Sequence, residues 1–376
     1  MKRLNGLSFM RIALLQDHLR NGGTENQTLH IAEGLAQAGL ETSVIVFRAG
    51  GVLDKRALNG AYQLHFLNQG LLKTDWFAPG LKRLLQSERI DVAIGMGRMA
   101  NCHVGLLSPS TSKLRFVATF RTGKSIPWLQ RRALKNADRL VANSQEALER
   151  LRINYGIERS GNARVIYNGC IRKFPTSQHK GSSLESKPIR LVCASMFRPE
   201  KKQKRLLRIC SKLNENIDWK LTLAGDGSER ISCIQEAKRL GIENRVYFPG
   251  LIEDPSDLYQ SSDIAIHASA KESLPNTLVE AQMSGLPVIA YNVGGVRETF
   301  DPNASGLLID QGDEDAFVEA LEKLALDPTL RQRMSTAARD YAHKHFAPEA
   351  QIQDYLDLLL PMKPAKRHRH RVLAQG

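Results

Sequence analysis

The chain has 376 residues, of which 42% are apolar and 24% are charged, which suits two globular domains and excludes wholesale disorder. Its net charge of +14 is unevenly placed: residues 1–185 contain 27 Lys/Arg against 13 Asp/Glu, whereas residues 186–376 contain 26 of each. A basic N-terminal half favours an anionic partner, such as an anionic lipid surface, a nucleic acid or a phosphorylated acceptor.

The first half of the chain alternates short apolar runs with helical patterns. The run at 10–15 suits a buried parallel strand, and the glycine loop 21–24 follows it, with Thr24 placed to cap a helix that ends at Gly39. Further apolar runs predict strands at 42–47, 90–94, 115–120, 139–143 and 164–167. This βαβ alternation predicts a Rossmann-like domain over residues 1–175.

A second alternation follows a polar segment, residues 176–188, which is the best linker candidate. Its apolar runs predict strands at 189–194, 220–224, 246–248, 264–267 and 287–290, within a domain over residues 189–345. We expect the basic tail, residues 363–376, to be disordered. Two doubly wound domains in tandem place a cleft between them, which is a usual position for a ligand.

The sequence predicts neither export nor membrane crossing. No stretch approaches the roughly 20 uncharged apolar residues of a spanning helix, and the apolar run near the N-terminus is too interrupted for a signal peptide. The five cysteines are scattered without a C-x-x-C pair, which indicates neither a zinc site nor a disulfide framework. Free thiols without an export signal predict a cytoplasmic location.

The strongest functional signal is the segment 271–281. Glu272 is expected in a loop after the strand 264–267, and Pro275 in the first turn of a helix whose free N–H groups could hold a diphosphate. Glu280 should lie about one and a half to two turns into that helix. Two acceptor carboxylates would then flank a phosphate-ready helix start, which suits the hydroxyls of a ribose and of a sugar on either side of a diphosphate.

The spacing Glu272-x7-Glu280, with Pro-Asn between and Gly-Leu-Pro-Val after, resembles the signature of retaining GT-B glycosyltransferases. That large bacterial group includes lipopolysaccharide, exopolysaccharide and phosphatidylinositol mannosyl and glucosyl transferases. The resemblance extends over roughly residues 9–360 and includes the glycine loop 21–25 and the segments 142–144, 166–169, 224–227 and 248–251. It implies an α/β fold of two Rossmann-like domains facing each other across a cleft. It also implies a last helix, residues 346–362, that crosses back to the N-terminal domain.

The resemblance also implies roles for particular residues, with the donor in the C-terminal domain. Glu280 would bind the ribose hydroxyls, Glu272 would contact the donor sugar as a catalytic residue, and Lys201 would neutralise the leaving diphosphate. Fixed positive charge is needed there because breaking the sugar–phosphate bond builds negative charge on the leaving group. The other donor-binding candidates are Gly22, Gly23, Ser273, Leu274, Pro275, Asn276 and Thr277.

The sequence departs from the family pattern in four places. Met196 stands where the family often has an arginine, so Arg198 is the candidate catalytic replacement, and Arg121 stands at a common histidine position. Ser273 replaces a common glycine and adds a Cβ close to the donor sugar, and the Asp that usually follows the pair 168–169 two residues on is absent. These changes leave the donor-binding argument standing and weaken the assignment of the acceptor-side candidates, Arg121 and Asn143.

The expected reaction is glycosyl transfer with retention, for which no nucleophile is assigned. A UDP-sugar is the default donor, and a GDP-sugar stays open. Since the chain has no suitably placed Asp-x-Asp, we expect no metal and no cofactor. The resemblance implies a lipid-linked or glycan acceptor in bacterial cell-surface glycan synthesis. The basic N-terminal domain would dock peripherally on the anionic inner face of the cytoplasmic membrane.

Three alternatives stay open at this point. A GT-B-fold nucleotide-sugar epimerase would need no acceptor and would leave the basic N-terminal half unexplained. A nicotinamide oxidoreductase would need Gly-x-Gly-x-x-Gly after a strand, which the loop 21–24 lacks. A non-enzymatic nucleic-acid binder fits the charge alone, but it lacks aromatic–basic platforms and leaves Glu272 and Glu280 idle, so no nucleic-acid partner is expected. His103 and His267 are interpreted as structural residues.

Overall fold

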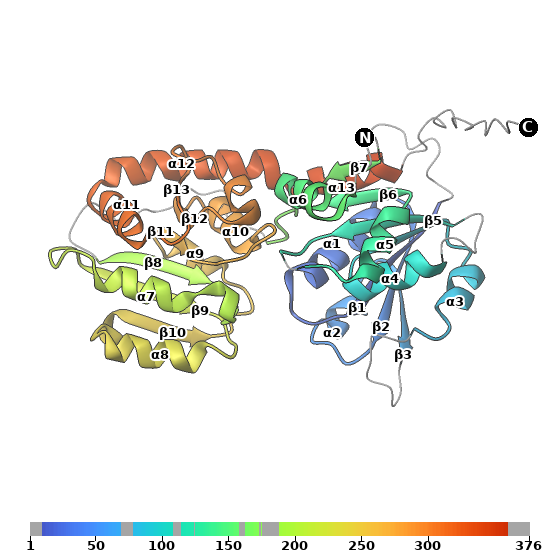
Figure 1. Ribbon diagram of the computed structural model, residues 1–376, viewed down its shortest axis with the longest axis horizontal. Coiled ribbons are helices and arrows are strands. Elements are labelled where there is room, and N and C mark those ends of the chain that lie inside the picture. Colours follow the sequence, from blue (N-terminus) through green and yellow to red (C-terminus); the bar gives the residue numbers. More distant parts are fainter. Residues whose placement is uncertain are drawn as a thin grey trace, which may run out of the picture.

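The computed structural model describes residues 10–68, 78–107, 114–123, 125–157, 162–172, 174 and 188–359. Apart from Pro188, the expected linker (176–188) lies outside these residues, as does the expected basic tail (363–376). Figure 1 shows two lobes side by side, each a parallel sheet with helices packed on it. This arrangement confirms the predicted α/β fold of two Rossmann-like domains.

The N-terminal lobe contains a seven-stranded sheet in the order β3-β2-β1-β4-β5-β6-β7, with every pairing parallel. Its strands are β1 (Arg11–His18), β2 (Glu41–Arg48), β3 (Gln63–Asn68), β4 (Val92–Gly95), β5 (Arg115–Phe120), β6 (Arg139–Ala142) and β7 (Ala163–Val165). Strand β3 was not predicted from the sequence, because at the edge of the sheet its apolar residues alternate with polar ones and form no continuous run.

The helices of this lobe are α1 (Gly23–Gln37), α2 (Asp54–Ala57), α3 (Leu81–Ser87), α4 (Arg98–Leu107), α5 (Trp128–Asn136) and α6 (Gln145–Tyr155). The prediction that Thr24 caps α1 is wrong. Gly22 is the N-cap, and its carbonyl accepts the Asn26 N–H at 3.1 Å, so Thr24 already lies within the first turn. The predicted end at Gly39 is confirmed, since this glycine has a φ of +91° just after the C-cap.

The C-terminal lobe contains a six-stranded parallel sheet in the order β10-β9-β8-β11-β12-β13. Its strands are β8 (Ile189–Ala194), β9 (Trp219–Ala224), β10 (Val246–Gly250), β11 (Ile264–His267), β12 (Val288–Tyr291) and β13 (Gly306–Ile309). The unpredicted strand β13 is a four-residue edge strand that begins with glycine. Both sheets carry their first strand near the middle, which places the loops at the carboxyl ends of the strands at one edge.

The helical segments of the second half complete this lobe and return the chain to the first one. They are η2 (Pro199–Lys201), α7 (Gln203–Ser211), α8 (Arg230–Arg239), η3 (Glu243–Arg245), α9 (Ser256–Gln260), α10 (Asn276–Met283), η4 (Gly294–Glu298), α11 (Glu314–Leu326), α12 (Pro328–Phe346) and α13 (Pro348–Leu359). In Figure 1, α12 runs along the C-terminal lobe and α13 lies against the N-terminal lobe. None of the described helices is long and apolar enough to cross a membrane.

Each lobe has its own hydrophobic core. One cluster fills the C-terminal lobe around β8, β9, β11 and β12, and two clusters cover the two faces of the N-terminal sheet. Side chains of α13, including Tyr355 and Leu359, belong to one of these N-terminal clusters together with Leu29 and Leu35 of α1. The last described helix therefore stabilises the first lobe, and it fixes how the lobes face each other.

Candidate functional site

The expected donor segment lies between β11 and α10. Pro275 is the N-cap of α10 with a φ of −75° and a ψ of 106°, so the helix begins at Asn276, one residue later than predicted. Extended backbone at Pro275 suits its ring, which has no N–H to contribute to a first turn. Glu280 is consequently the fifth helical residue, just over one turn along and nearer to the helix start than predicted.

The start of α10 has unused hydrogen-bond donors. No side chain caps it, and among the described residues the N–H groups of Asn276 and Thr277 find no acceptor. The Thr277 hydroxyl oxygen is also buried, and it has no hydrogen-bond partner in the described part of the chain. Since helix N-termini carry partial positive charge and free N–H groups, this point can accept an anionic group such as a phosphate.

Glu272 forms a buried ion pair in the loop before α10. Its Oε1 lies 2.6 Å from the Lys201 Nζ and 2.8 Å from the His267 Nε2. The Glu272 side chain is only 9% exposed and that of Lys201 is 19% exposed. Burial alone would raise the pKa of Glu272, but the Lys201 ammonium and the hydrogen bond from His267 lower it to about 2. Glu272 is therefore ionised at neutral pH, and its Oε2 accepts no hydrogen bond from any described residue.

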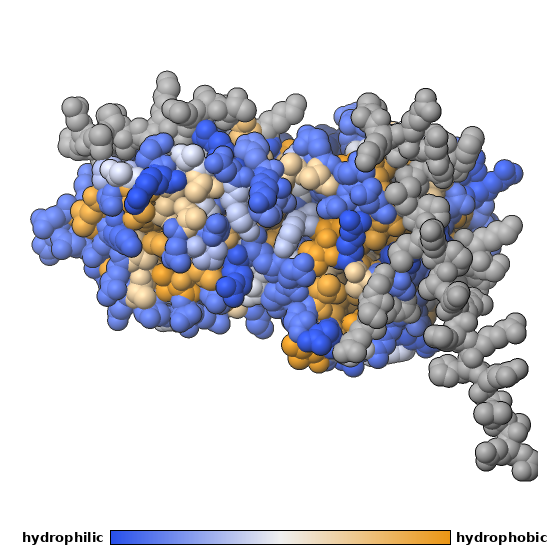
Figure 2. Space-filling model, turned by 90° about the horizontal axis from the view of Figure 1, so that it is seen from above, coloured by the Kyte–Doolittle hydropathy of each residue, from blue (hydrophilic) through white to orange (hydrophobic). Residues whose placement is uncertain are grey.

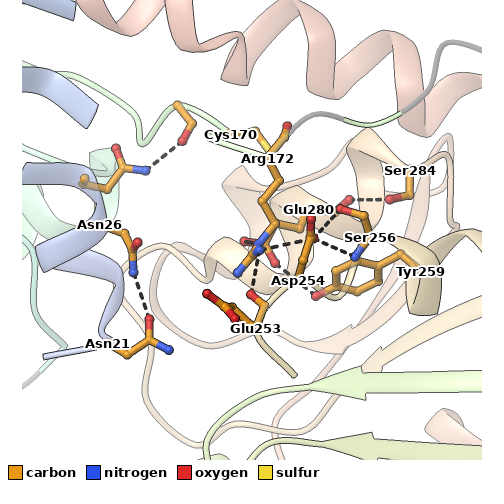
Figure 3. A network of polar contacts seen from close by, with 12 residues as sticks. Asn21, Asn26, Cys170, Arg172, Glu253, Asp254, Ser256, Tyr259, Glu280 and Ser284 are labelled. Atoms are coloured by element: carbon orange, nitrogen blue, oxygen red, sulfur yellow. Dashed lines mark hydrogen bonds and ion pairs between the residues drawn. The ribbon is translucent and has the colours of Figure 1, made fainter. Parts of the chain in front are cut away.

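Glu280 is the second carboxylate beside the helix start. Arg172 donates from Nε to its Oε1 at 3.1 Å, and Tyr259 donates from its hydroxyl to Oε2 at 3.3 Å. Figure 3 shows this carboxylate between Arg172 and Tyr259. Burial raises the pKa of Glu280, and the positive charge of Arg172 acts against that rise.

Two further residues of the donor segment contact the N-terminal lobe. The Ser273 hydroxyl donates to Asn143 Oδ1 at 2.6 Å, and both residues are buried. Asn276 Oδ1 accepts from Asn168 Nδ2 at 2.7 Å. Gly23 lies against the same segment, because a Cβ there would come within 2.9 Å of Asn276 Nδ2. The loops at the carboxyl ends of the strands in the two sheets therefore meet at the donor segment.

Two of the remaining candidate residues, Arg121 and Leu274, contact other parts of the chain. Arg121 donates from Nη2 to the Tyr355 hydroxyl of α13 at 3.1 Å and from Nη1 to Asn168, so it joins the connection between the lobes to the last helix. Leu274 packs into a small apolar cluster with Val279 and Phe346, so its side chain serves packing. Acceptor-side roles for Arg121 and Asn143 stay predictions. Asn143 contacts Ser273 of the other lobe, whereas Arg121 contacts Asn168 and Tyr355 on the N-terminal side.

Arg198 and Gly22 belong to different lobes. Arg198 is exposed at the end of β8, beside a cavity of about 320 Å³ that it lines together with Lys202 and Arg205. Glu25 follows Gly22 at the start of α1, and burial raises its pKa while the positive charges of Arg20 and Arg198 lower it. An arginine of one lobe therefore acts electrostatically on a carboxyl of the other. The part of the C-terminal lobe around Arg198 therefore carries several cations, Lys202 and Arg205 among them.

Two family descriptions match the chain, one on each lobe. Residues 176–341 match glycosyl transferases group 1, and residues 21–171 match glycosyltransferase family 4. The chain is a GT-B glycosyltransferase. Membership accounts for the two Rossmann-like lobes.

Relatives of this glycosyltransferase are similar over nearly its whole length. The lipopolysaccharide core biosynthesis glycosyltransferase LpsE of Rhizobium meliloti is 26% identical over 348 residues, which are 90% of this chain and 96% of that protein. The solved structure of Anabaena HepE with UDP superposes with a TM-score of 0.79 at 22% identity, covering 93% of this chain and 99% of that one. The lipopolysaccharide outer core galactosyltransferase WaaB in its apo form gives 0.75 at 19% identity, covering 93% and 99%. At these identities the two structures show a common fold.

Sequence reasoning missed three residues around the site of the glycosyltransferase. His267 was interpreted as structural, yet it contacts Glu272, and Arg172 was not considered although it pairs with Glu280. Glu298 was also not considered, and it accepts the N–H groups of Gln145 and Glu146 at 2.7 and 2.9 Å. For Arg172 a signal existed, because it lies three residues after Gly169, in the segment where the usual Asp is absent. Among the described residues, no group of three or more His, Cys, Asp or Glu could hold a metal ion.

Proposed function

We propose that this glycosyltransferase moves a sugar from a UDP-sugar to a lipid-linked or polysaccharide acceptor, with retention at the anomeric carbon and without a metal ion. The observation that carries this proposal is the start of α10, where two buried carboxylates, Glu272 and Glu280, flank an uncapped helix N-terminus. A diphosphate that joins a ribose to a sugar matches this order of hydrogen-bond acceptors and donors.

The donor would lie along the segment from Glu272 to Glu280. Glu280 would accept the ribose hydroxyls, the N–H groups of Asn276 and Thr277 would face the diphosphate, and the unpaired Oε2 of Glu272 would accept hydroxyls of the sugar. Solved structures of HepE with UDP and with UDP-glucose, which share this fold, support a uridine nucleotide as the donor. The close approach of Gly23 to Asn276 places the N-terminal lobe at the same point.

Protein cations would stabilise the leaving diphosphate. Lys201 lies beside Glu272 at the carboxyl end of the sheet, Arg198 is exposed nearby, and the helix start adds partial positive charge. Because negative charge grows on the diphosphate as the sugar–phosphate bond breaks, such fixed charges lower the barrier. The support for metal-free catalysis is this supply of charge from the chain itself. Displacement on one face of the sugar, assisted by the leaving phosphate, needs no protein nucleophile.

The surface of the N-terminal lobe supports an acceptor held at an anionic membrane. Its helix α5 carries Trp128, which is 70% exposed, with exposed Arg132 and Lys135 on the same helix. On the face seen in Figure 2, apolar residues form separate patches among hydrophilic ones. Names of relatives such as LpsE support lipopolysaccharide assembly as the pathway class.

Membrane docking is tested by sedimentation with vesicles that contain anionic lipid. Wild type should sediment with them more strongly than a Trp128→Ser, Arg132→Ser variant. Equal sedimentation of the two proteins would contradict membrane docking.

The proposed reaction is tested by measuring nucleotide release from UDP- and GDP-sugars in the presence of bacterial membrane lipids. We expect release from one UDP-sugar, unchanged by millimolar EDTA, and a product linkage with the donor's anomeric configuration by NMR. Lys201→Ala should lower kcat by about 10²–10³. Lys212→Ala is the matched control, since Lys212 pairs with Asp315 on the same lobe. Equal activity of the two variants, or no release from any nucleotide-sugar, would overturn the proposal.

A further inference from the structure

The Glu280 carboxylate takes its counter-charge from outside its own helix. Arg172 donates to it from Nε at 3.1 Å, and Arg172 lies in the chain connection that leaves β7 of the N-terminal lobe. The Glu280 side chain is 15% exposed and that of Arg172 is 31% exposed. In the described part of the chain, Arg172 is the only cation within ion-pair distance of Glu280. A carboxylate this buried needs such a partner, because an unpaired buried charge is strongly destabilising.

The same guanidinium also holds a second segment of the C-terminal lobe. Arg172 Nη1 donates to the Glu253 carbonyl at 3.0 Å and to Asp254 Oδ1 at 3.3 Å. Asp254 Oδ1 in turn accepts the backbone N–H and the hydroxyl of Ser256, at 3.0 and 2.6 Å, where α9 begins. Figure 3 shows the Arg172 guanidinium between Glu280 and the Glu253–Asp254 segment. One side chain therefore links the interlobe connection, the loop after β10 and the carboxylate of α10.

The groups around Glu280 make its charge state depend on Arg172. Burial raises the pKa of Glu280 and the negative charge of Asp254 raises it further, while Arg172 and the Tyr259 hydroxyl lower it. Cys170 is a further titratable neighbour among the described residues, and burial raises the pKa of its thiol to about 12, so it stays neutral. Arg172 supplies the positive charge in this set.

We propose that Arg172 is a positioning residue for the nucleotide. It keeps Glu280 ionised and oriented to accept ribose hydroxyls, and it fixes the Glu253–Asp254 segment beside them. This inference rests on the proposed function, in which Glu280 binds the ribose. Arg172 touches the carboxylate and not the reacting atoms, so its effect falls on binding of the nucleotide half of the donor. Because Arg172 belongs to the connection, the nucleotide site is also tied to the link between the lobes.

The test is the Kd of UDP alone, measured by calorimetry for wild type, Arg172→Gln, Arg172→Lys and Glu280→Gln. Arg172→Gln should weaken UDP binding about tenfold, and Arg172→Lys should recover part of that loss because it keeps the charge. Arg190→Gln is the matched control: Arg190 pairs with Asp263 at 3.0 Å at the start of β8, with similar exposure and away from the cleft. It should lower the melting temperature and leave the Kd of UDP within twofold of wild type. If Arg172→Gln does not fold, Arg172→Lys carries the comparison.

A pH series separates positioning from plain stabilisation. Ribose hydroxyls donate to the ionised carboxylate, so protonation of Glu280 weakens binding. Without Arg172 this protonation should occur at higher pH, and the ratio of the Kd of Arg172→Gln to that of wild type should rise from pH 8 to pH 6. The ratio cancels the titration of UDP itself. Arg172→Gln binding UDP within twofold of wild type while Glu280→Gln does not would overturn this inference alone. If Glu280→Gln also binds normally, the proposed function fails with it.

Discussion

The Glu272 carboxylate accepts both of its described hydrogen bonds on one oxygen, Oε1, from Lys201 and His267. Two donors on one oxygen fix the rotamer and leave the other oxygen for a ligand. The same contacts stabilise the ionised form, which explains a low pKa at a buried position where desolvation alone would favour the neutral acid. The stability of this loop and the proposed recognition of the donor therefore depend on the same three side chains.

The pH dependence of stability should report this arrangement. The pKa of Glu272 is about 2 in the folded chain and near 4.5 when unfolded, so its stabilisation is complete above about pH 4.5 and is lost as the pH falls toward 2. The free energy of unfolding of wild type should exceed that of Glu272→Gln by on the order of 3 kcal/mol at pH 6. Denaturant titrations at pH 6, 4 and 3 should show this excess shrinking. An excess that stays constant over this range would contradict the assignment.

His267 should affect the sugar half of the donor and not the nucleotide half. His267→Leu removes one donor to Glu272 Oε1 and frees the carboxylate to rotate, so we expect UDP-sugar binding to weaken about tenfold. UDP alone should bind as in wild type, because Glu272 would not contact it. His267→Gln, whose amide can donate from a similar place, should recover part of the affinity. Equal losses for UDP and UDP-sugar would indicate a structural role only.

At the scale of single residues, the sequence indicated the site residues that belong to the family pattern and no others. Glu272, Lys201 and Glu280 were found because they recur at fixed spacing in the family pattern. His267 lies only five residues from Glu272, but a single histidine at the end of a buried strand carries no local signal of that contact. Arg172 was missed because its partner Glu280 lies 108 residues further along the chain. Pairings of that range depend on how the lobes meet and cannot be derived from local pattern.

At the scale of elements, helix α6 begins with caps from both lobes. Ser144 of its own lobe accepts the Ala147 N–H at 3.0 Å, while Glu298 of η4 accepts the N–H groups of Gln145 and Glu146 and the Tyr167 hydroxyl. A carboxylate at a helix N-terminus is favoured by the free N–H groups and by the helix dipole. The start of α6 is thus a fixed point between the lobes.

Glu298→Ala and Ser144→Ala should each lower the free energy of unfolding by about 1–2 kcal/mol, since each removes a cap from the same helix. Only Glu298→Ala removes a contact between lobes, so only this variant should increase the radius of gyration in small-angle scattering. Ser144→Ala is the matched control for loss of helix stability. Equal scattering curves for both variants would show that Glu298 does not hold the lobes together.

Gly294, the first residue of η4, packs against the backbone of Glu272, and we expect this position to require glycine. It has a φ of +53°, and a Cβ there would lie 2.1 Å from the Glu272 carbonyl oxygen. Gly241 also has a positive φ, +69°, but open space around its Cβ position. Alanine at either site should cost about 1–2 kcal/mol of stability from backbone strain. Only Gly294→Ala should displace Glu272 and lower kcat/KM for the donor by at least about tenfold. Similar kcat/KM values for both variants would contradict this role.

At the scale of the whole molecule, the lobes are joined by side chains as well as by the chain connection. Tyr355 of α13, Arg121, Asn168 and Asn276 form a continuous series of hydrogen bonds from the N-terminal lobe to the start of α10. Ser273 and Asn143 add a second contact beside Glu272. Movement of one lobe relative to the other would therefore displace Ser273 and Asn276 of the donor segment.

The two-lobe fold was predictable because buried parallel strands form continuous apolar runs, as at 12–15 and 264–266. The edge strands β3 and β13 were not predicted, because a strand at the edge of a sheet need not form a continuous apolar run. The helix start at Asn276 was misplaced by one residue, because a proline fits both the N-cap and the first turn. The packing of α13 on the N-terminal lobe was expected only from the family resemblance. The apolar face of α13 alone does not indicate which element it packs against.

The central claim is that the start of α10 binds a nucleoside diphosphate through Glu280. The most direct measurement is the melting temperature of wild type and Glu280→Ala with UDP, GDP, ADP, CMP and NAD, because a ligand of the native state raises it by mass action. We expect UDP to raise the melting temperature of wild type by several degrees and that of Glu280→Ala hardly at all. Stabilisation by NAD alone, by no nucleotide, or equally in both proteins would contradict the claim.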